Sequence, residues 1–327
     1  MIYRNGLTGL AVVLALGVSL PAMAADLMMD EPAPMVVDDA QSAVTISGGI
    51  GVLWLEGNEY VYQSSTSDDR LSHLIWQSTA PVLTAGLDVA LPEGWTFSAK
   101  AQVGMGGDSY MEDYDWIEPF AGGNYGDDDW THRSQHEDTN LDWYFNGTVL
   151  AGYNVIANDG LTVNLNAGFK YTDVQWAATG GSYIYSDMGF RDSSGDFPDE
   201  PAITYHQQFP AVIAGLDVQF VQDALTIDLG AHAGATFSAT SQDNHWMRDL
   251  VITDEIQTAG LVQVSGQASF AVTDDMSIFL GGTLEQILTA RADAHYDFTP
   301  DPDSDYLDGQ GADLFAATLT AGVKGTF

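Results

Sequence analysis

Apolar and polar residues alternate with a period of two along much of this 327-residue chain. From Leu161 to Phe169 the odd positions are apolar and the even positions are small or polar, and the stretch from Leu225 to Phe237 repeats the pattern. Such a period predicts β-strands with one apolar face. Beyond the first 24 residues no run of about 20 apolar residues occurs, so a helical membrane span is not predicted. Small and polar residues on one face with apolar residues on the other are typical of a transmembrane β-barrel.

Ten such stretches can be counted, and an even number is what a single-chain bacterial barrel requires. They lie near residues 43–62, 73–89, 94–105, 141–154, 160–176, 203–220, 224–240, 252–271, 276–292 and 312–327. The connections alternate between short ones, near 92–94, 157–160, 222–223 and 274–275, and long ones, near 63–72, 106–140, 177–202, 241–251 and 293–311. Short turns of such barrels face the periplasm and long loops face outward.

The predicted fold class is therefore all-β: a ten-stranded antiparallel transmembrane β-barrel over residues 43–327, with five long outer loops and four short periplasmic turns. Several strands exceed the roughly 9–11 residues that cross a bilayer, so the barrel should extend above the membrane. Residues 1–24 have the charged start, apolar core and small-residue end of a signal peptide. Residues 25–42, rich in Met, Pro and acids, are predicted to be a flexible N-terminal lead.

Charge restricts the class of partner. The chain has 9 Lys and Arg against 46 Asp and Glu, and it has no cysteine. Such an excess of acid argues against nucleic acid as a partner. It favours cationic peptides or divalent ions, although solubility in a high-salt habitat would give the same composition.

Two short acidic motifs follow alternating stretches, at positions where a barrel wall needs no charge. One contains Asp113 and Asp115, and the other contains Asp243 and His245. A carboxylate beside an imidazole holds one tautomer and keeps the ring basic, while two close carboxylates can share a proton. Together these side chains could hold and deprotonate a water molecule. If the alternation of the preceding strands continued, all four side chains would point outward. A bulge or turn must therefore redirect them toward the interior.

Several loop and strand-end segments resemble the omptins, a family of ten-stranded outer-membrane proteases. The resemblance covers nearly the whole chain after the signal peptide. It is densest at Gly180–Ser186 and continues through residues 189–192 and 197–198. Further agreement lies at residues 130–131, 136–141 and, more weakly, 72–76.

The resemblance implies an aspartate- and histidine-dependent endopeptidase in the cell outer membrane, with its active site facing the exterior. Asp113, Asp115, Asp243 and His245 match the catalytic positions of the family. By the resemblance, Asp243 orients His245, and a water between His245 and the Asp113/Asp115 pair attacks the scissile carbonyl. The implied partners are cationic peptide or protein substrates and outer-membrane lipid, and we expect a monomer.

Other matched positions concern specificity and lipid. Glu59 matches the acid that binds the basic side chain of the substrate, whereas a second pocket acid of the family corresponds to Ser241 here. This departure weakens the expectation of strict dibasic preference. Lipopolysaccharide activates the family through cationic residues, but the matching positions are Asp173 and Gln208. We therefore expect no cofactor, no metal, and no tight binding of lipid phosphates at these two positions. Activation is then either independent of lipid, dependent on bridging divalent cations, or lost.

A second interpretation remains open. The chain could be a non-enzymatic surface barrel, either an adhesin or a structural protein, built on the same scaffold. A porin fits less well, because ten strands leave little open lumen. The enzyme and the binding scaffold differ in whether Asp243 and His245 face Asp113 and Asp115 across the mouth.

Overall fold

The structure is a computed structural model that describes residues 42–298 and 302–327. The predicted signal peptide and all but the last residue of the predicted lead lie outside the described residues. The described strands and short 3₁₀ helices are β1 (Ala43–Tyr62), β2 (Arg70–Ala90), η1 (Pro92–Gly94), β3 (Trp95–Gly104), β4 (Asp108–Asp115), η2 (Asp127–Asp129), β5 (His132–Asn158), β6 (Leu161–Thr179), β7 (Ser182–Tyr185), β8 (Ser193–Asp196), β9 (Pro201–Gln222), β10 (Leu225–Thr236), β11 (Ala239–His245), η3 (Trp246–Arg248), β12 (Leu250–Ile256), β13 (Gly260–Ala271), β14 (Met276–Phe298) and β15 (Ser304–Thr326).

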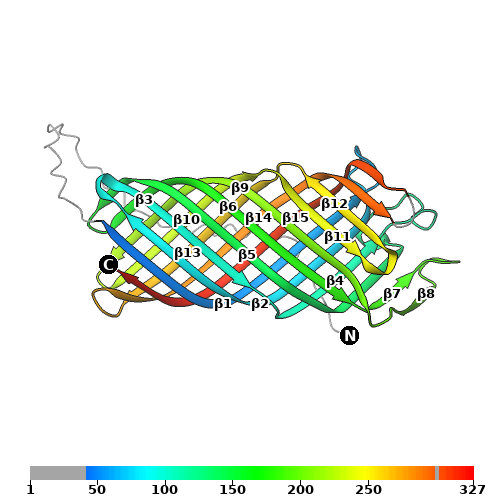
Figure 1. Cartoon of the computed structure of the whole chain (residues 1–327), viewed down its shortest axis with the longest axis horizontal. Helices are drawn as coiled ribbons and strands as arrows, with labels where there is room; N and C mark the ends of the chain where they lie inside the picture. The colour runs from blue at the N-terminus through cyan, green and yellow to red at the C-terminus, as the bar shows by residue number, and fades with distance from the viewer. Residues whose placement is uncertain (1–41, 299–301) are drawn as a thin grey trace. The chain divides into compact units, whose positions relative to one another are not determined.

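The strands close into one antiparallel ring with ten positions, which confirms the predicted barrel (Figure 1). β3 and β4 share one position, because both pair with β2 and β5. β10 and β11 share another beside β9, and β13 and β12 share the next beside β14. The ring closes where β1 pairs with β15. β7 and β8 form a hairpin within the outer connection between β6 and β9, and β7 pairs with the outer end of β5.

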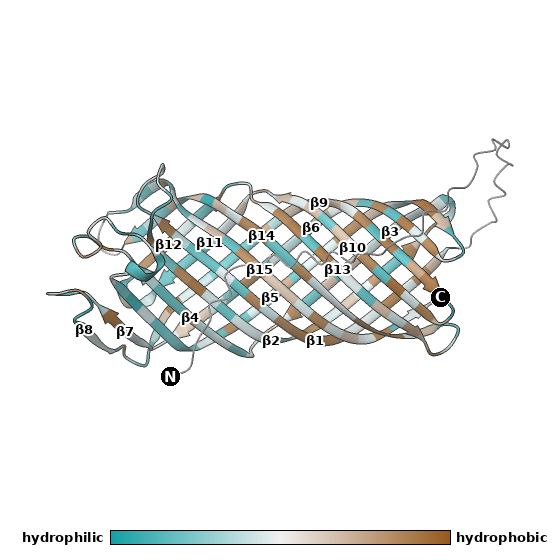
Figure 2. Ribbon diagram, turned by 180° about the vertical axis from the view of Figure 1, so that it is seen from behind, coloured by the Kyte–Doolittle hydropathy of each residue, from teal (hydrophilic) through white to brown (hydrophobic). Residues whose placement is uncertain are grey.

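The half of the barrel near the short turns carries the apolar outer surface. Exposed large apolar side chains repeat at every second position there, and Figure 2 shows brown residues gathered around the end that bears the C-terminus. They include Ile50, Leu83, Phe97, Leu165, Val212, Leu229, Val264, Leu280 and Leu319. This is the surface that lipid covers in an outer-membrane barrel. In the described part of the chain, no helix is long and apolar enough to span a membrane.

The strands at the opposite end are longer than the alternation predicted. β5 begins at His132, within the segment expected to be a loop up to residue 140. β11 and β12 likewise occupy most of the expected loop 241–251, so that only residues 246–249 lie between the two strands. The candidate residues Asp113, Asp115, Asp243 and His245 therefore lie on strands rather than in loops.

The inward and outward faces exchange between β3 and β4 and between β10 and β11. Val103 is exposed on β3, but Met111 is fully buried on β4, although both have odd numbers. The phase changes across residues 105–107, where Gly106 and Gly107 have φ values of 64° and 87°. The inward-facing positions also change from even to odd numbers at Phe237 and Ser238, before β11, where Ser238 has a left-handed φ of 48°. This is the redirection that the sequence pattern required.

The lumen below the outer end is filled with side chains. Trp76, Trp176 and Tyr205 form a stacked aromatic layer, with ring centroids 5.9–6.4 Å apart. Below it, Lys170 Nζ lies 2.6 Å from Glu285 Oε2, and both side chains are buried. A polar cavity of about 550 Å³ lies lower still, toward the short turns. The outer end of the barrel is therefore supported by a packed interior.

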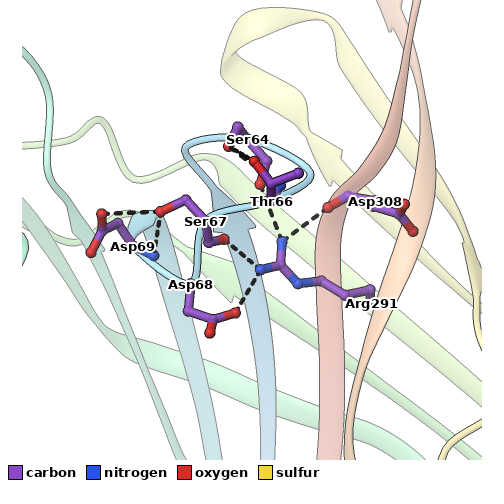
Figure 3. Close-up of polar contacts among 7 residues, drawn as sticks. All are labelled: Ser64, Thr66, Ser67, Asp68, Asp69, Arg291 and Asp308. Atoms are coloured by element: carbon purple, nitrogen blue, oxygen red, sulfur yellow. Dashed lines mark hydrogen bonds and ion pairs between the residues drawn. The ribbon is translucent and has the colours of Figure 1, made fainter.

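Arg291 on β14 holds the first outer loop, residues 63–69, against the outer ends of β14 and of β15, the strand that neighbours β1 in the ring (Figure 3). Its guanidinium donates to the carbonyl oxygens of Ser67 and Asp308 and to Oδ1 of Asp68, and it lies 3.4 Å from the centroid of the Tyr62 ring. A planar guanidinium with five donors suits such a cluster of acceptors. The loop leads directly into the outer end of β2.

Candidate active site

Asp243 and His245 are neighbours on the inner face of β11. Nε2 of His245 lies 2.6 Å from Oδ2 of Asp243, and the two residues are 7% and 0% exposed. β11 pairs with β9 on one side and β12 on the other, so the backbone of both residues is held in register. The alternation of the strand places both side chains on the same face, since they are two residues apart.

Asp113 and Asp115 lie on the inner side of β4, between β2 and β5. Ser72 on β2 donates its hydroxyl proton to Oδ1 of Asp113 at 3.1 Å. Burial raises the pKa of Asp113, against the opposing charges of His245 and Arg248. Burial and then the charge of Asp113 raise the pKa of Asp115 well above its usual range. The pair therefore favours holding one proton between two carboxyl groups.

The two pairs face each other at the outer end. β4 and β11 occupy opposite parts of the ring, with β5, β6 and β9 between them on one side. The charges of both His245 and Asp243 act on the carboxyl group of Asp113, which requires proximity. The structure thus brings together all four residues that the sequence singled out.

Arg248 was not predicted from the sequence, yet its side chain enters this arrangement. It ends η3, and Asp249 then turns the chain into β12 with a left-handed φ of 46°. Nη2 of Arg248 lies 2.5 Å from Nδ1 of His245. Its charge lowers the pKa of both Asp113 and Asp115. Arg248 is therefore the cation shared by the two pairs.

Glu59 on β1 lies directly behind Asp243. It is 1% exposed, and its carboxyl group lies close enough to Asp243 for the charge of that residue to act on it. Burial, followed by the charges of Asp243 and Asp254, raises the pKa of Glu59 well above its usual range. Glu59, which the sequence predicted as a binding acid, therefore lies beside the Asp243–His245 pair.

Asp254 on β12 is a second acid that sequence reasoning missed. It faces Ser241 across the β11–β12 pair, and the Ser241 hydroxyl donates to its Oδ2 at 2.7 Å. Burial raises the pKa of Asp254 to about 7. The available signal was the alternation in β12, because Asp254 lies in phase with the buried residues Ile252 and Ile256.

Asp173 and Gln208 are paired neighbours on the outer wall of β6 and β9. The carboxylate of Asp173 accepts from Trp143 Nε1 at 2.6 Å, from Gln208 Nε2 at 3.0 Å and from the Tyr171 hydroxyl at 2.9 Å. His206 Nε2 lies 2.9 Å from the same group. At these positions the outer wall therefore presents a carboxylate that already accepts hydrogen bonds from neighbouring side chains.

No group of three or more His, Asp or Glu residues is arranged to hold a metal ion among residues 42–298 and 302–327. The side chains gathered at the site are groups that exchange protons. An imidazole with a buried carboxylate can act as a base, and a carboxyl pair that shares a proton can act as an acid. A site of this composition suits hydrolysis by an activated water.

Fold and site together define an outer-membrane β-barrel with an acid–base site at its outer end. A model of the Omptin family matches residues 40–327, so the chain belongs to the omptin family. Its location in the outer membrane and its barrel architecture are as predicted.

Named relatives and a solved structure agree with this assignment. The chain is 27% identical over 286 residues to Protease 7 of Escherichia coli O157:H7, covering 85% of this chain and 88% of the relative. It is 23% identical over 305 residues to the plasminogen activator of Yersinia pestis, covering 90% and 92%. The crystal structure of outer membrane protease OmpT from Escherichia coli superposes with a TM-score of 0.79 at 22% identity, covering 91% of this chain and 99% of that chain. That superposition supports the fold.

Proposed function

We propose that this protein is an outer-membrane endopeptidase that cleaves peptide bonds beside basic residues. The buried Asp243–His245 pair and the half-buried Asp113/Asp115 pair, which face each other at the outer end of the barrel, carry this proposal. His245 is the base, Asp243 holds its ring, and Asp113 with Asp115 supplies a shared proton. Relatives named as proteases support the same activity.

The proposed reaction balances with these groups alone. A water held between the pairs gives a proton to His245 while its oxygen attacks the scissile carbonyl carbon. The Asp113/Asp115 pair donates a hydrogen bond to the carbonyl oxygen as negative charge develops there. The proton on His245 then passes to the leaving nitrogen, and the C–N bond breaks to give a carboxyl and an amine. Nδ1 of His245 must first be released by Arg248, because a ring nitrogen that accepts from Arg248 cannot also accept from water.

The preference for basic residues follows from the acids around the site. Glu59 lies behind Asp243, and no Lys or Arg of the described chain forms an ion pair with it. A substrate cation near the scissile bond would compensate this buried acid. We also propose that lipopolysaccharide is not required, because Asp173 and Gln208 provide no cation for a lipid phosphate.

The test is to refold the chain after residue 24 in detergent, with and without lipopolysaccharide, and to assay a quenched peptide containing Arg-Arg. The His245→Ala variant is compared with His295→Ala, a matched control whose side chain is half exposed and pairs with Asp305. We expect cleavage by the wild type and by His295→Ala, and loss of at least about 1,000-fold in His245→Ala. A folded wild type that cleaves nothing in either condition would favour the binding-scaffold interpretation.

A further inference from the structure

The Asp254 carboxyl group is only half satisfied within the protein. Its Oδ2 accepts from Ser241, but its Oδ1 has no hydrogen-bond partner among the described residues, and the side chain is 1% exposed. A buried acceptor without a donor costs free energy, so native proteins rarely keep one without a use. Ser241 alone does not account for an acid at this position.

Glu59 presents a second unsatisfied oxygen to the same place. Its Oε2 also lacks a partner in the described structure, and Asp254 is among the charges that raise its pKa. The pKa values of Tyr205 and Tyr296 are raised by burial and then by both Glu59 and Asp254. The two acids therefore lie close together, with Tyr205 and Tyr296 beside them and Asp243 next to Glu59. These five residues are called the chamber below.

The groups that face this chamber accept hydrogen bonds and carry no positive charge. None of the ion pairs formed by Lys or Arg in the described ranges includes Glu59 or Asp254. Taking carboxylates out of water without a cation is costly. A ligand that brings donors and a positive charge would remove this cost, and both lysine and arginine side chains do so.

We propose that Asp254 is a specificity-determining residue, which with Glu59 receives the basic side chain beside the scissile bond. This inference rests on the proposed endopeptidase function and names the residue that sets its selectivity. Ser241 and Asp254 are direct cross-strand partners, and such partners have Cβ atoms about 5 Å apart. A carboxylate on either strand therefore reaches the same chamber. The acid that is absent at position 241 is present on the opposite strand.

Selectivity should then depend on pH. Because the pKa of Asp254 is raised to about 7, its negative charge is present above that pH and is lost as the pH falls through it. The titratable groups facing it are Glu59 from β1, Asp243 from β11, Tyr205 from β9 and Tyr296 from β14. The KM for a basic peptide should rise below neutral pH, while that for a neutral peptide should not.

The experiment compares two peptides that differ only in arginine or citrulline, its neutral isostere, before the cleaved bond. The variants are Asp254→Asn, the double exchange Ser241→Asp/Asp254→Ser, and the control Glu255→Gln on the outward face of β12. We expect Asp254→Asn to lower kcat/KM for the arginine peptide about 10- to 100-fold, chiefly through KM, with the citrulline peptide unchanged. The double exchange should restore the ratio to within about fivefold, and Glu255→Gln should keep it.

An unchanged arginine-to-citrulline ratio in folded Asp254→Asn would overturn the proposal and leave Asp254 a partner of Ser241 only. Folding is checked by the heat-dependent shift of barrels in gel electrophoresis, and the double exchange provides a second variant if Asp254→Asn fails to fold. Binding of both peptides to His245→Ala, with and without Asp254→Asn, measures the chamber without turnover. Selective arginine binding without any wild-type cleavage would reject the endopeptidase and retain the chamber, whereas equal binding of both peptides would reject the chamber.

Discussion

The guanidinium of Arg248 donates to Nδ1 of His245 across 2.5 Å, while Nε2 of the same ring faces Asp243 at 2.6 Å. A guanidinium has no acceptor, so Nδ1 must be the unprotonated nitrogen and Nε2 the protonated one. Both nitrogens are therefore engaged in the substrate-free protein. Arg248 thus affects the site through its charge and through its occupation of Nδ1.

The charge of Arg248 should set the acid limb of the pH–rate profile. Because Arg248 lowers the pKa of Asp113 and Asp115, the Arg248→Ala variant raises both. Each carboxyl group then ionises only at a higher pH, so the acid limb should move upward by about one pH unit. Arg248→Lys retains the charge and should leave the limb near its original position. Identical limbs in the alanine and wild-type proteins would contradict this role.

The hydrogen bond from Ser72 should contribute to the activity of the Asp113/Asp115 pair. The Ser72→Ala variant removes the donor to Asp113, and we expect kcat to fall about 2- to 10-fold with little change in KM. Ser78→Ala is the matched control on the same strand, since Ser78 bonds to Ser109 on β4 below the site. Steady-state kinetics of both variants would show whether the effect is local to Asp113, and equal losses would argue against it.

The phase change before β4 should depend on Gly107 more than on Gly106. A Cβ at Gly107 would clash with the Thr79 carbonyl, and its φ of 87° is unfavourable for alanine. Gly106 has a φ of 64° but open space around it. We expect Gly106→Ala to lose about 1 kcal/mol of stability and to keep cleaving. Gly107→Ala should lose both heat stability and activity, and comparable behaviour of the two variants would refute the assignment.

The buried Lys170–Glu285 pair should support the barrel interior. Lys170→Met leaves the Glu285 carboxylate buried and unpaired, which should cost about 3–5 kcal/mol. Lys324→Met is the control, because Lys324 lies 3.5 Å from a partly exposed Asp228 and should contribute less than about 1 kcal/mol. Denaturant unfolding in detergent measures both. A small loss in Lys170→Met would mean that Glu285 is neutral in the folded protein.

Much of the fold could be predicted because a barrel strand repeats every two residues. The lipid-facing stretches, such as Leu161–Phe169, are fixed by that repeat alone. The outer ends were shortened in the prediction because their polar residues, as in β11, no longer alternate with apolar ones. Backbone pairing with β9 and β14 continues there regardless of hydropathy.

The candidate site was predictable where spacing along one strand determines it. Asp243 and His245 share a face because they are two residues apart, and Asp113 and Asp115 do so for the same reason. The contacts of Asp254 and Arg248 depend instead on cross-strand register and on the short turn at 246–249. Neither can be inferred from local spacing.

The left-handed residues Gly107 and Ser238 act as joints. Below them, on β3 and β10, odd-numbered residues face lipid, whereas above them, on β4 and β11, odd-numbered residues face the barrel interior. The sequences below and above each joint can therefore change independently in evolution, provided that the number of residues in the joint stays the same. A chimera of two relatives that crosses over at residues 105–107 and 237–238 should keep its anchor and its chemistry intact. Loss of a single residue at either joint would turn the candidate site residues of β4 or β11 outward.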